Sequence, residues 1–259
     1  MLSFSANLSM LFTEAGFLER FARASKAGFR AVECQFPYPY DRGAIAEELR
    51  RHALKLVLHN LPAGDWAGGE RGIACLPDRV GEFQDGVGRA IDYAAALGCP
   101  QVNCLAGLVP AGTDRATLHQ TFVDNLRFAA RELKSHGLTL VVEPLNTRDV
   151  PGFFLQTSRQ AVAIIEEVGA DNLALQFDVY HAHIMEGDLV RTIERNLPYI
   201  AHVQVADDPG RHEPGTGSID FASVFATLSR ANYRNWIGCE YVPSSTTEEG
   251  LGWLKVVDA

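Results

Sequence analysis

The sequence lacks long apolar runs and has no excess of positive charge. No apolar run approaches the roughly 20 residues that span a bilayer, so we expect no membrane partner. The chain has 23 Lys and Arg against 32 Asp and Glu, and its net charge is −9. This balance argues against a nucleic-acid partner, because phosphate binding requires a basic face. An anionic substrate would need cations supplied locally.

Cysteine is also scarce, and no CxxC pair is present. The five cysteines form an odd set: Cys34, Cys75, Cys99, Cys104 and Cys239. Three of them lie in apolar runs, which is typical of reduced thiols in the core of a cytoplasmic protein. The first residues, MLSFSANLSMLF, lack a basic segment and a small-residue cleavage site. We therefore expect no signal peptide and a cytoplasmic location.

The 259 residues contain 47% apolar residues, enough to fill a barrel interior and the layer between strands and helices of a single domain, residues 1–259. Short apolar runs predict eight strands at Ser3–Ala6, Ala31–Gln35, Lys55–His59, Gln101–Leu105, Thr139–Glu143, Leu173–Asp178, Ala201–Val205 and Trp236–Glu240. Amphipathic stretches predict eight helices at Glu14–Lys26, Gly43–His52, Arg79–Leu97, Asp114–Ser135, Ser158–Glu167, Gly187–Arg195, Phe221–Ser229 and Glu248–Val256.

Eight repeats of strand and helix, with strands apolar along most of their length, predict a parallel sheet covered by helices. Eight such units close a (β/α)8 TIM barrel. An open doubly wound sheet is the alternative, but the glycine-rich dinucleotide turn expected after its first strand is missing. The longest non-periodic stretch, residues 60–77, follows the third strand, and we interpret it as a lid over the barrel mouth.

Oxygen-bearing side chains stand at the ends of four consecutive strands. They are Glu143, Asp178, Gln204 and Glu240, separated by 35, 26 and 36 residues, about one strand–helix unit each. Strand ends of a barrel meet at one face, where active sites form. Oxygen-only ligation favours Mg²⁺ or Mn²⁺ over zinc. The alternative is a network of ion pairs with arginines at the rim.

Two glutamates beside a metal suit proton transfer next to a carbonyl. We therefore expect Glu143 and Glu240 to be catalytic and all four residues to be metal ligands. A glycoside hydrolase also uses paired carboxylates, but Asp178 and Gln204 between the pair indicate metal binding instead.

At these residues the sequence resembles the xylose-isomerase-like TIM-barrel superfamily, and within it the hydroxypyruvate isomerases. The matching segments cover essentially the whole chain, and the longest is His59–Cys75; the others are residues 4–10, 143–146, 178–181, 202–207, 211–217, 238–241 and 246–251. The resemblance implies interconversion of hydroxypyruvate and 2-hydroxy-3-oxopropanoate. It also assigns catalysis to Glu143 and Glu240, and metal binding to these two with Asp178 and Gln204. Many relatives have histidine where Gln204 stands.

The expected substrate is therefore a small anionic hydroxy-keto acid. Three carboxylates outweigh one divalent ion, so a substrate carboxylate needs its own cation. Arg211, in the loop after the seventh strand, is the first candidate and Arg71, in the lid, the second. His59, Asp149 and His181 are further candidates for substrate binding, each weighed against a packing or salt-bridge role.

Three other residues have weaker interpretations. Glu33 is expected to be a structural acid rather than a catalyst, and Trp66 could close the pocket or simply pack. His181 and His183 together are only a weak signal for zinc.

Several other functions remain open from the sequence. An isomerase of a four-carbon 2-oxo acid (2-oxotetronate) and a keto-sugar 3-epimerase would use the same glutamates. A zinc-dependent endonuclease acting at abasic sites should have a basic groove and more ligands. A non-catalytic protein that binds sugar acids is a further alternative. A homo-oligomer is compatible with the sequence.

Overall fold

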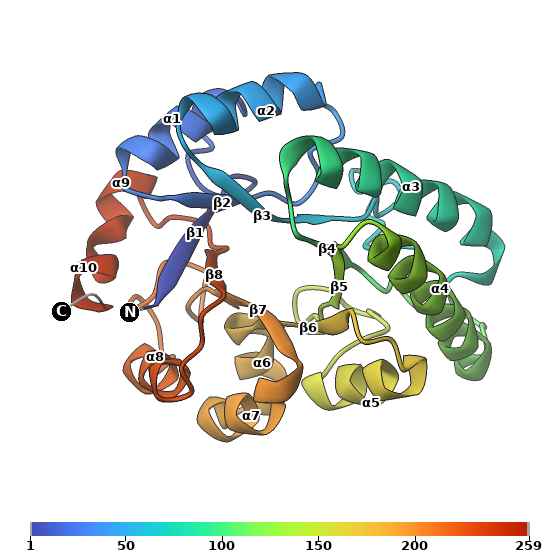
Figure 1. Cartoon of the computed structure of the whole chain (residues 1–259). Helices are drawn as coiled ribbons and strands as arrows, with labels where there is room; N and C mark the ends of the chain where they lie inside the picture. Colours follow the sequence, from blue (N-terminus) through green and yellow to red (C-terminus); the bar gives the residue numbers. More distant parts are fainter. Residues whose placement is uncertain (1, 258–259) are drawn as a thin grey trace.

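The computed structural model describes residues 2–257, with side chains up to residue 255. Eight parallel strands form one closed barrel in chain order, and β1 pairs with β8 (Figure 1). The fold class expected from the alternation is thereby confirmed. The strands are β1 (Ser3–Asn7), β2 (Ala31–Glu33), β3 (Lys55–Asn60), β4 (Gln101–Cys104), β5 (Thr139–Val142), β6 (Leu173–Asp178), β7 (Ile200–Val205) and β8 (Trp236–Cys239).

Helices surround the barrel, as Figure 1 shows. They are α1 (Glu19–Lys26), α2 (Arg42–Arg51), α3 (Val80–Leu97), α4 (Arg115–Ser135), α5 (Ser158–Val168), α6 (Val179–Glu186), α7 (Leu189–Asn196), α8 (Phe221–Arg230), α9 (Thr247–Gly250) and α10 (Leu254–Val257). Many of the helices have a polar residue at the N-cap: Asp41, Asp114 and Asp220 each accept a hydrogen bond from a backbone amide of the first turn. Left-handed glycines, including Gly98 with φ of 64°, end others.

Three helical predictions differ from the structure. Helix α1 begins at Glu19, not Glu14, because residues 8–18 form turns in which Phe12 has a φ of 58°. The last predicted helix is divided into α9 and α10 by a 3-10 turn at Leu251–Trp253. Helix α6 was not predicted; it follows β6 directly and contains His181 and His183.

The hydrophobic core lies between the strands and the helices. Outward-facing strand residues such as Val32, Val102 and Val203 are completely buried there. All five cysteines are buried free thiols, as expected. Within residues 2–257, none of the helices combines the length and the apolar character that crossing a bilayer would require.

The barrel interior, by contrast, contains a buried polar network beside apolar residues such as Leu58 and Val141, whereas the apolar content of the chain led us to expect an apolar filling. Glu33 is fully buried there and accepts hydrogen bonds from Ser5, Asn7 and Gln204. His202 of β7 bridges Gln101 of β4 (3.2 Å) and Glu33 of β2 (2.8 Å) across the barrel. Polar and apolar residues alternate along these strands, and the polar set points inward. Most donors and acceptors of the network find partners, which makes this burial tolerable, although the Asn103 and Gln176 amide oxygens have none among the described residues.

The long connection after β3 lies against the barrel rather than away from it. Gly72 forms an isolated antiparallel β-bridge with Ala106, and the Cys75 backbone amide donates a hydrogen bond to the Ala106 carbonyl at 2.8 Å. A side chain at Gly72 would meet the Leu105 carbonyl at 2.3 Å, so glycine permits this approach. Farther along, Glu70 and Arg79 form an ion pair at 2.7 Å. The segment is thus fixed at its C-terminal side, and it brings Trp66 and Arg71 to the mouth.

Candidate functional site

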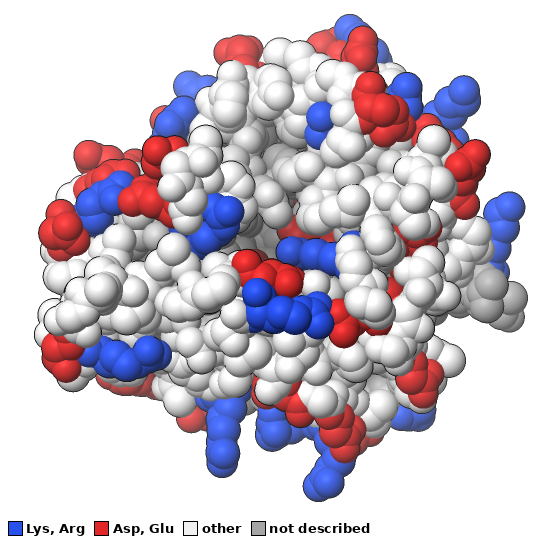
Figure 2. Space-filling model, turned by 180° about the vertical axis from the view of Figure 1, so that it is seen from behind, with Lys and Arg blue, Asp and Glu red and all other residues white. Residues whose placement is uncertain are grey.

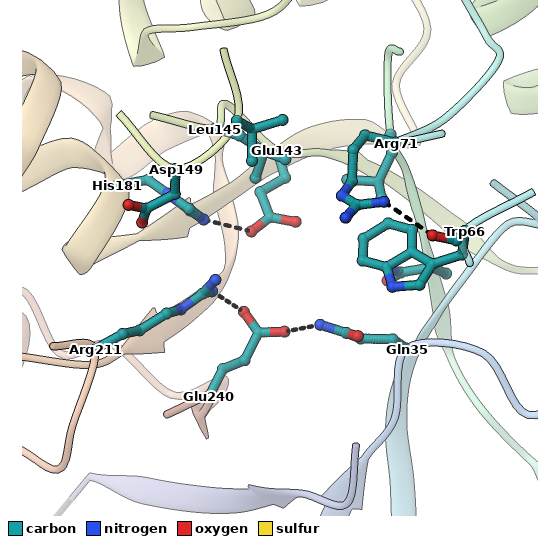
Figure 3. A pocket seen from close by; sticks show the side chains of 12 residues that line it. Gln35, Trp66, Arg71, Glu143, Leu145, Asp149, His181, Arg211 and Glu240 are labelled. Atoms are coloured by element: carbon teal, nitrogen blue, oxygen red, sulfur yellow. Dashed lines mark hydrogen bonds and ion pairs between the residues drawn. The ribbon is translucent and has the colours of Figure 1, made fainter. Parts of the chain in front are cut away.

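A cavity of about 220 Å³ lies at the carboxyl ends of the strands. The face seen in Figure 2 is hollowed near its centre, with acidic and basic side chains at the edge of the hollow. Figure 3 shows the side chains inside the cavity. The lining residues are Gln35, Asn60, Trp66, Arg71, Leu105, Glu143, Leu145, Asp149, Val150, His181, Arg211 and Glu240.

Glu143 and Glu240 follow β5 and β8, and their carboxylates point into the same space (Figure 3). Both are buried, with exposed fractions of 5% and 4%. Amides from neighbouring strands fix their orientation. The Asn103 amide donates to Glu143 at 2.8 Å. Asn7 (3.1 Å) and Gln35 (2.9 Å) both donate to the Oε1 atom of Glu240.

Burial shifts the acidity of both glutamates. It raises the pKa of Glu143 well above its usual value, and the negative charges of Glu240 and Asp178 add to the rise. Burial also raises the pKa of Glu240 to about 7, against the lowering effect of Arg211. A carboxyl group whose pKa lies near neutrality can both accept and return a proton.

Asp178 ends β6 and caps α6. Its Oδ1 atom accepts a hydrogen bond from the Tyr180 amide at 2.8 Å. Its Oδ2 atom is therefore the oxygen that faces the other side chains of the site and could bind a metal ion. Oδ2 lies 3.6 Å from the Nε2 atom of His181, and Glu143 Oε1 lies 4.0 Å from the same nitrogen. Ligand atoms of Glu143, Asp178 and His181 all lie within 4.8 Å of one another, close enough to hold a metal ion.

The hydrogen bonds of His181 indicate how its ring is protonated. Its Nδ1 atom accepts from the Asn146 backbone amide at 3.2 Å, and burial lowers its pKa to about 4. A neutral ring with an accepting Nδ1 carries its proton on Nε2. In this tautomer Nε2 is a donor and has no lone pair for a metal. The carboxylates are therefore better ligands here than His181.

Arg211 occupies the place of a cation between two of these acids. Its Nη2 atom lies 2.7 Å from Glu240 and 3.2 Å from Asp178. The guanidinium also lies 5.2 Å from the centre of the Tyr180 ring. Its Nε atom is buried without a partner among the described residues. This arginine shows that the strand ends form a site for positive charge.

Gln204 lies in β7, beneath the cavity, and does not line it. Its amide nitrogen donates to Glu33 at 2.7 Å, and its oxygen accepts from Gln176 at 2.6 Å. Burial raises the pKa of Glu33, but His202 and the hydrogen bonds from His202, Gln204 and Ser5 outweigh it, so the pKa lies below its usual value. An ionised Glu33 accepts a hydrogen bond from the Gln204 amide nitrogen. The amide oxygen of Gln204 therefore points away from Glu33.

Of the other residues predicted to bind substrate, one lines the cavity and one does not. Asp149 lines the cavity and accepts a hydrogen bond from the Tyr180 hydroxyl at 2.7 Å. His59 is fully buried and does not line it. β3 extends one residue farther than predicted, so Asn60 faces the cavity and His59 faces Tyr38 behind the strand. His59 is thus not placed where the sequence-based interpretation put it.

Comparison with known proteins identifies the family and agrees with the barrel fold. Residues 21–257 match the family described as xylose isomerase-like TIM barrel. Hydroxypyruvate isomerase of Escherichia coli K12 is 51% identical over 98% of both chains. The chain belongs to the hydroxypyruvate isomerase family. A 2-oxo-tetronate isomerase of Cupriavidus necator is 46% identical over 97% of both chains. The crystal structure of a family 2 AP endonuclease from Brucella melitensis is 47% identical, covers 99% of both chains and superimposes with a TM-score of 0.96.

The residues of this family member also fit a divalent metal. Three buried carboxylates, Glu143, Asp178 and Glu240, converge at this site, and among the described residues the basic side chain paired with them is that of Arg211. Buried carboxylates require such a charge, and a hard cation with oxygen ligands would provide more of it.

Sequence reasoning missed the amides that surround the site: Asn7, Gln35, Asn60 and Asn103. Each lies within two residues of the end of a strand, and this position was their signal. These four amides lie on β1, β4 and β3 or after β2, outside the run of consecutive strands β5–β8 whose ends the sequence marked with carboxylates.

Proposed function

We propose that the protein is a metal-dependent isomerase that interconverts hydroxypyruvate and 2-hydroxy-3-oxopropanoate. The reaction is a 1,2 hydrogen shift between a ketone and an aldehyde. Glu143 and Glu240 carry out the proton transfers, and these two with Asp178 and Gln204 would hold Mg²⁺ or Mn²⁺. The metal, when bound, polarises the substrate carbonyl and stabilises negative charge on its oxygen.

Proton transfer follows from the positions of the glutamates. One carboxylate removes a proton from C3 of hydroxypyruvate, and the bonding electrons form a double bond between C3 and C2. The electrons of the C2 carbonyl move to its oxygen, which takes up a proton. Return of a proton to C2 and loss of the C3 hydroxyl proton then give the aldehyde with a hydroxyl group on C2. No atom is gained or lost. Asn103 on Glu143, and Asn7 and Gln35 on Glu240, keep each carboxylate aimed at the cavity.

Three neighbouring groups would bind the substrate oxygens. The Nε2–H group of His181 lies beside Glu143 and Asp178 and can donate to an oxygen that develops negative charge. Arg211 lines the same cavity and can donate to an oxygen when its carboxylate partners bind a metal instead. Asp149, held by Tyr180, can accept from a substrate hydroxyl.

The observation that carries this proposal is the meeting of two buried glutamates from β5 and β8 across one small cavity. An acid and a base on either side of a small substrate are what a hydrogen shift requires. The 51% identity to a hydroxypyruvate isomerase supports the choice of substrate.

The test is a coupled assay of hydroxypyruvate isomerisation with Mn²⁺ or Mg²⁺ and after chelator treatment. We expect turnover with metal and its loss after chelation. Full activity after exhaustive chelation would remove the metal from the mechanism. No conversion of hydroxypyruvate with either ion would refute the proposed substrate.

A second candidate, 2-oxo-tetronate, is favoured by the 46% identical Cupriavidus relative. Its fourth carbon requires more room, which a cavity of about 220 Å³ provides. The ratio of kcat/KM for the two acids distinguishes the candidates, and D-fructose in the same assay tests keto-sugar activity.

The AP endonuclease name of the Brucella structure makes cleavage of duplex DNA with an abasic site the necessary contrast assay. The net charge of −9 disfavours that substrate. DNA cleavage without isomerase activity would overturn our assignment.

A further inference from the structure

Two arginines enter the cavity from opposite sides, as Figure 3 shows. Arg211 comes from the loop after β7, and Arg71 comes from the connection after β3. The sequence predicts both as partners for a substrate carboxylate. Their surroundings in the structure differ, and the difference assigns them different tasks.

The positive charge of Arg211 is already used. It forms ion pairs with Asp178 and Glu240, both almost completely buried. A divalent cation together with Arg211 would neutralise the three carboxylates of the site. Nothing of that positive charge is then left over for a substrate anion.

Arg71 has no carboxylate partner. Among the described residues, no acidic oxygen lies within 4.0 Å of its guanidinium. The neighbouring acid, Glu70, is paired with Arg79 at 2.7 Å instead. Arg71 is therefore a cation on the cavity wall whose charge is not balanced locally.

The guanidinium of Arg71 is nevertheless held in place. Its Nη1 atom donates to the backbone carbonyls of Trp66 (3.1 Å) and Glu70 (2.7 Å). Its central carbon lies 4.2 Å from the centre of the Trp66 ring, so the two planes interact closely. Among the described residues, neither Nε nor Nη2 has a hydrogen-bond partner. One edge of a fixed fork is thus free, and such an edge matches a carboxylate.

We propose that Arg71, supported by Trp66, binds the substrate carboxylate and makes the site selective for 2-oxo acids over uncharged ketoses of the same size. This inference rests on the proposed function for the identity of the reaction. A neutral ketose would leave the Arg71 charge unpaired in a cavity of about 220 Å³, whereas a 2-oxo acid would neutralise it.

The experiment compares hydroxypyruvate with dihydroxyacetone, in which a CH₂OH group replaces the carboxylate and the same hydrogen shift gives glyceraldehyde. In Arg71→Gln we expect kcat/KM for hydroxypyruvate to fall about 10²-fold, as for loss of charge-assisted hydrogen bonds. Turnover of dihydroxyacetone should stay within about threefold of the wild type. Arg71→Lys keeps the charge but not the forked guanidinium, so its kcat/KM for hydroxypyruvate should lie between the values of the wild type and Arg71→Gln.

Arg89→Gln is the matched control. Arg89 also stacks on an aromatic ring, that of Tyr38 at 4.8 Å, and also donates to a backbone carbonyl, but it does not line the cavity. Its variant should resemble the wild type with both substrates. Equal losses with both substrates in Arg71→Gln, or no loss with hydroxypyruvate, would overturn the assignment.

Binding separates this inference from the proposed reaction. Calorimetry on the Mn²⁺-loaded protein gives dissociation constants for pyruvate, an acid, and hydroxyacetone, its uncharged counterpart. Arg71→Gln should weaken pyruvate binding at least about tenfold and leave hydroxyacetone binding unchanged. If Arg71 governs pyruvate binding but hydroxypyruvate is not isomerised, the proposed reaction fails and the carboxylate site stands. If hydroxypyruvate is isomerised and pyruvate binding does not depend on Arg71, this inference fails.

Discussion

The Nη2 atom of Arg211 lies 2.7 Å from the Oε2 atom of Glu240, a carboxylate that we propose as a metal ligand. The guanidinium and a metal ion therefore neutralise the same acid. The same nitrogen also lies 3.2 Å from Asp178, the next proposed ligand. The stability of the site without metal thus depends on Arg211, and its dependence should decrease once a metal is bound.

Arg211→Gln is expected to destabilise the metal-free protein by about 1–3 kcal/mol, because it removes a cation from between buried acids. Solvent screening limits this loss, because the Arg211 side chain is 23% exposed. Addition of Mn²⁺ should then raise the melting temperature more in the variant than in the wild type. Thermal denaturation with EDTA and with Mn²⁺ measures both effects, and equal Mn²⁺-induced shifts would contradict the shared role.

The two glutamates should be individually indispensable for turnover. We expect Glu143→Gln and Glu240→Gln each to reduce kcat by at least about 10², the scale of general acid–base catalysis. Steady-state kinetics at saturating Mn²⁺ and far-ultraviolet circular dichroism of both variants test this. Near-normal turnover in either folded variant would contradict the role of that glutamate and leave a protein that only binds sugar acids as an alternative.

The fold could be predicted from the sequence because its signal is repeated. Each of eight apolar runs is followed by an amphipathic stretch, and the strand bounds differ from those observed by at most two residues. Helix α6 was missed because its apolar residues do not lie on one face. It follows Asp178 without any loop, so no turn residues mark its start.

The site was predicted only in part, since the strand-end acids are visible in the sequence but the direction of neighbouring side chains is not. At the end of β3, an error of one residue exchanged His59 for Asn60. The polar interior around Glu33 could not be inferred from single strands, because its hydrogen bonds join β1, β2 and β7 across the barrel. Such contacts exist only after the barrel closes.

Glu240 should make the metal-free protein less stable as the pH rises. Its pKa is raised to about 7 in the folded state, whereas an unfolded glutamate titrates near 4.5. Between these values the folded state binds more protons than the unfolded state, so the free energy of unfolding falls with increasing pH. Glu143 acts in the same direction.

The measurement is the difference in stability between the wild type and Glu240→Gln, determined by urea unfolding in EDTA from pH 5 to 8. The difference removes the contributions of groups that both proteins share, such as His59 and His181, whose lowered pKa values act in the opposite direction. The wild type should lose roughly 2–3 kcal/mol relative to the variant over this range. A difference independent of pH would show that Glu240 does not titrate there.

Glu33 should influence the metal site although it does not line the cavity. Its ionised carboxylate accepts the Gln204 amide nitrogen at 2.7 Å and the Asn7 amide at 3.1 Å, and Asn7 also holds Glu240. Glu33→Gln replaces one acceptor oxygen by a donor and forces one of these amides to turn. We expect calorimetry to show Mn²⁺ binding weakened about 10-fold or more. Unchanged affinity would mean that the buried network acts only on stability.

Gly238 of β8 should not tolerate a side chain, because Glu33 lies directly opposite it inside the barrel. A Cβ atom at Gly238 would lie 2.3 Å from a Glu33 carboxylate oxygen. That carboxylate is fully buried and fixed by hydrogen bonds from four side chains, so it cannot move aside without breaking them. Gly238→Ala is therefore expected to destabilise the protein by about 2–4 kcal/mol in urea unfolding.

Gly88→Ala is the control, since a Cβ atom there would meet nothing within 4 Å, and alanine in helix α3 should stabilise by up to about 1 kcal/mol. Equal stabilities of the two variants would show that Glu33 is free to move within the barrel.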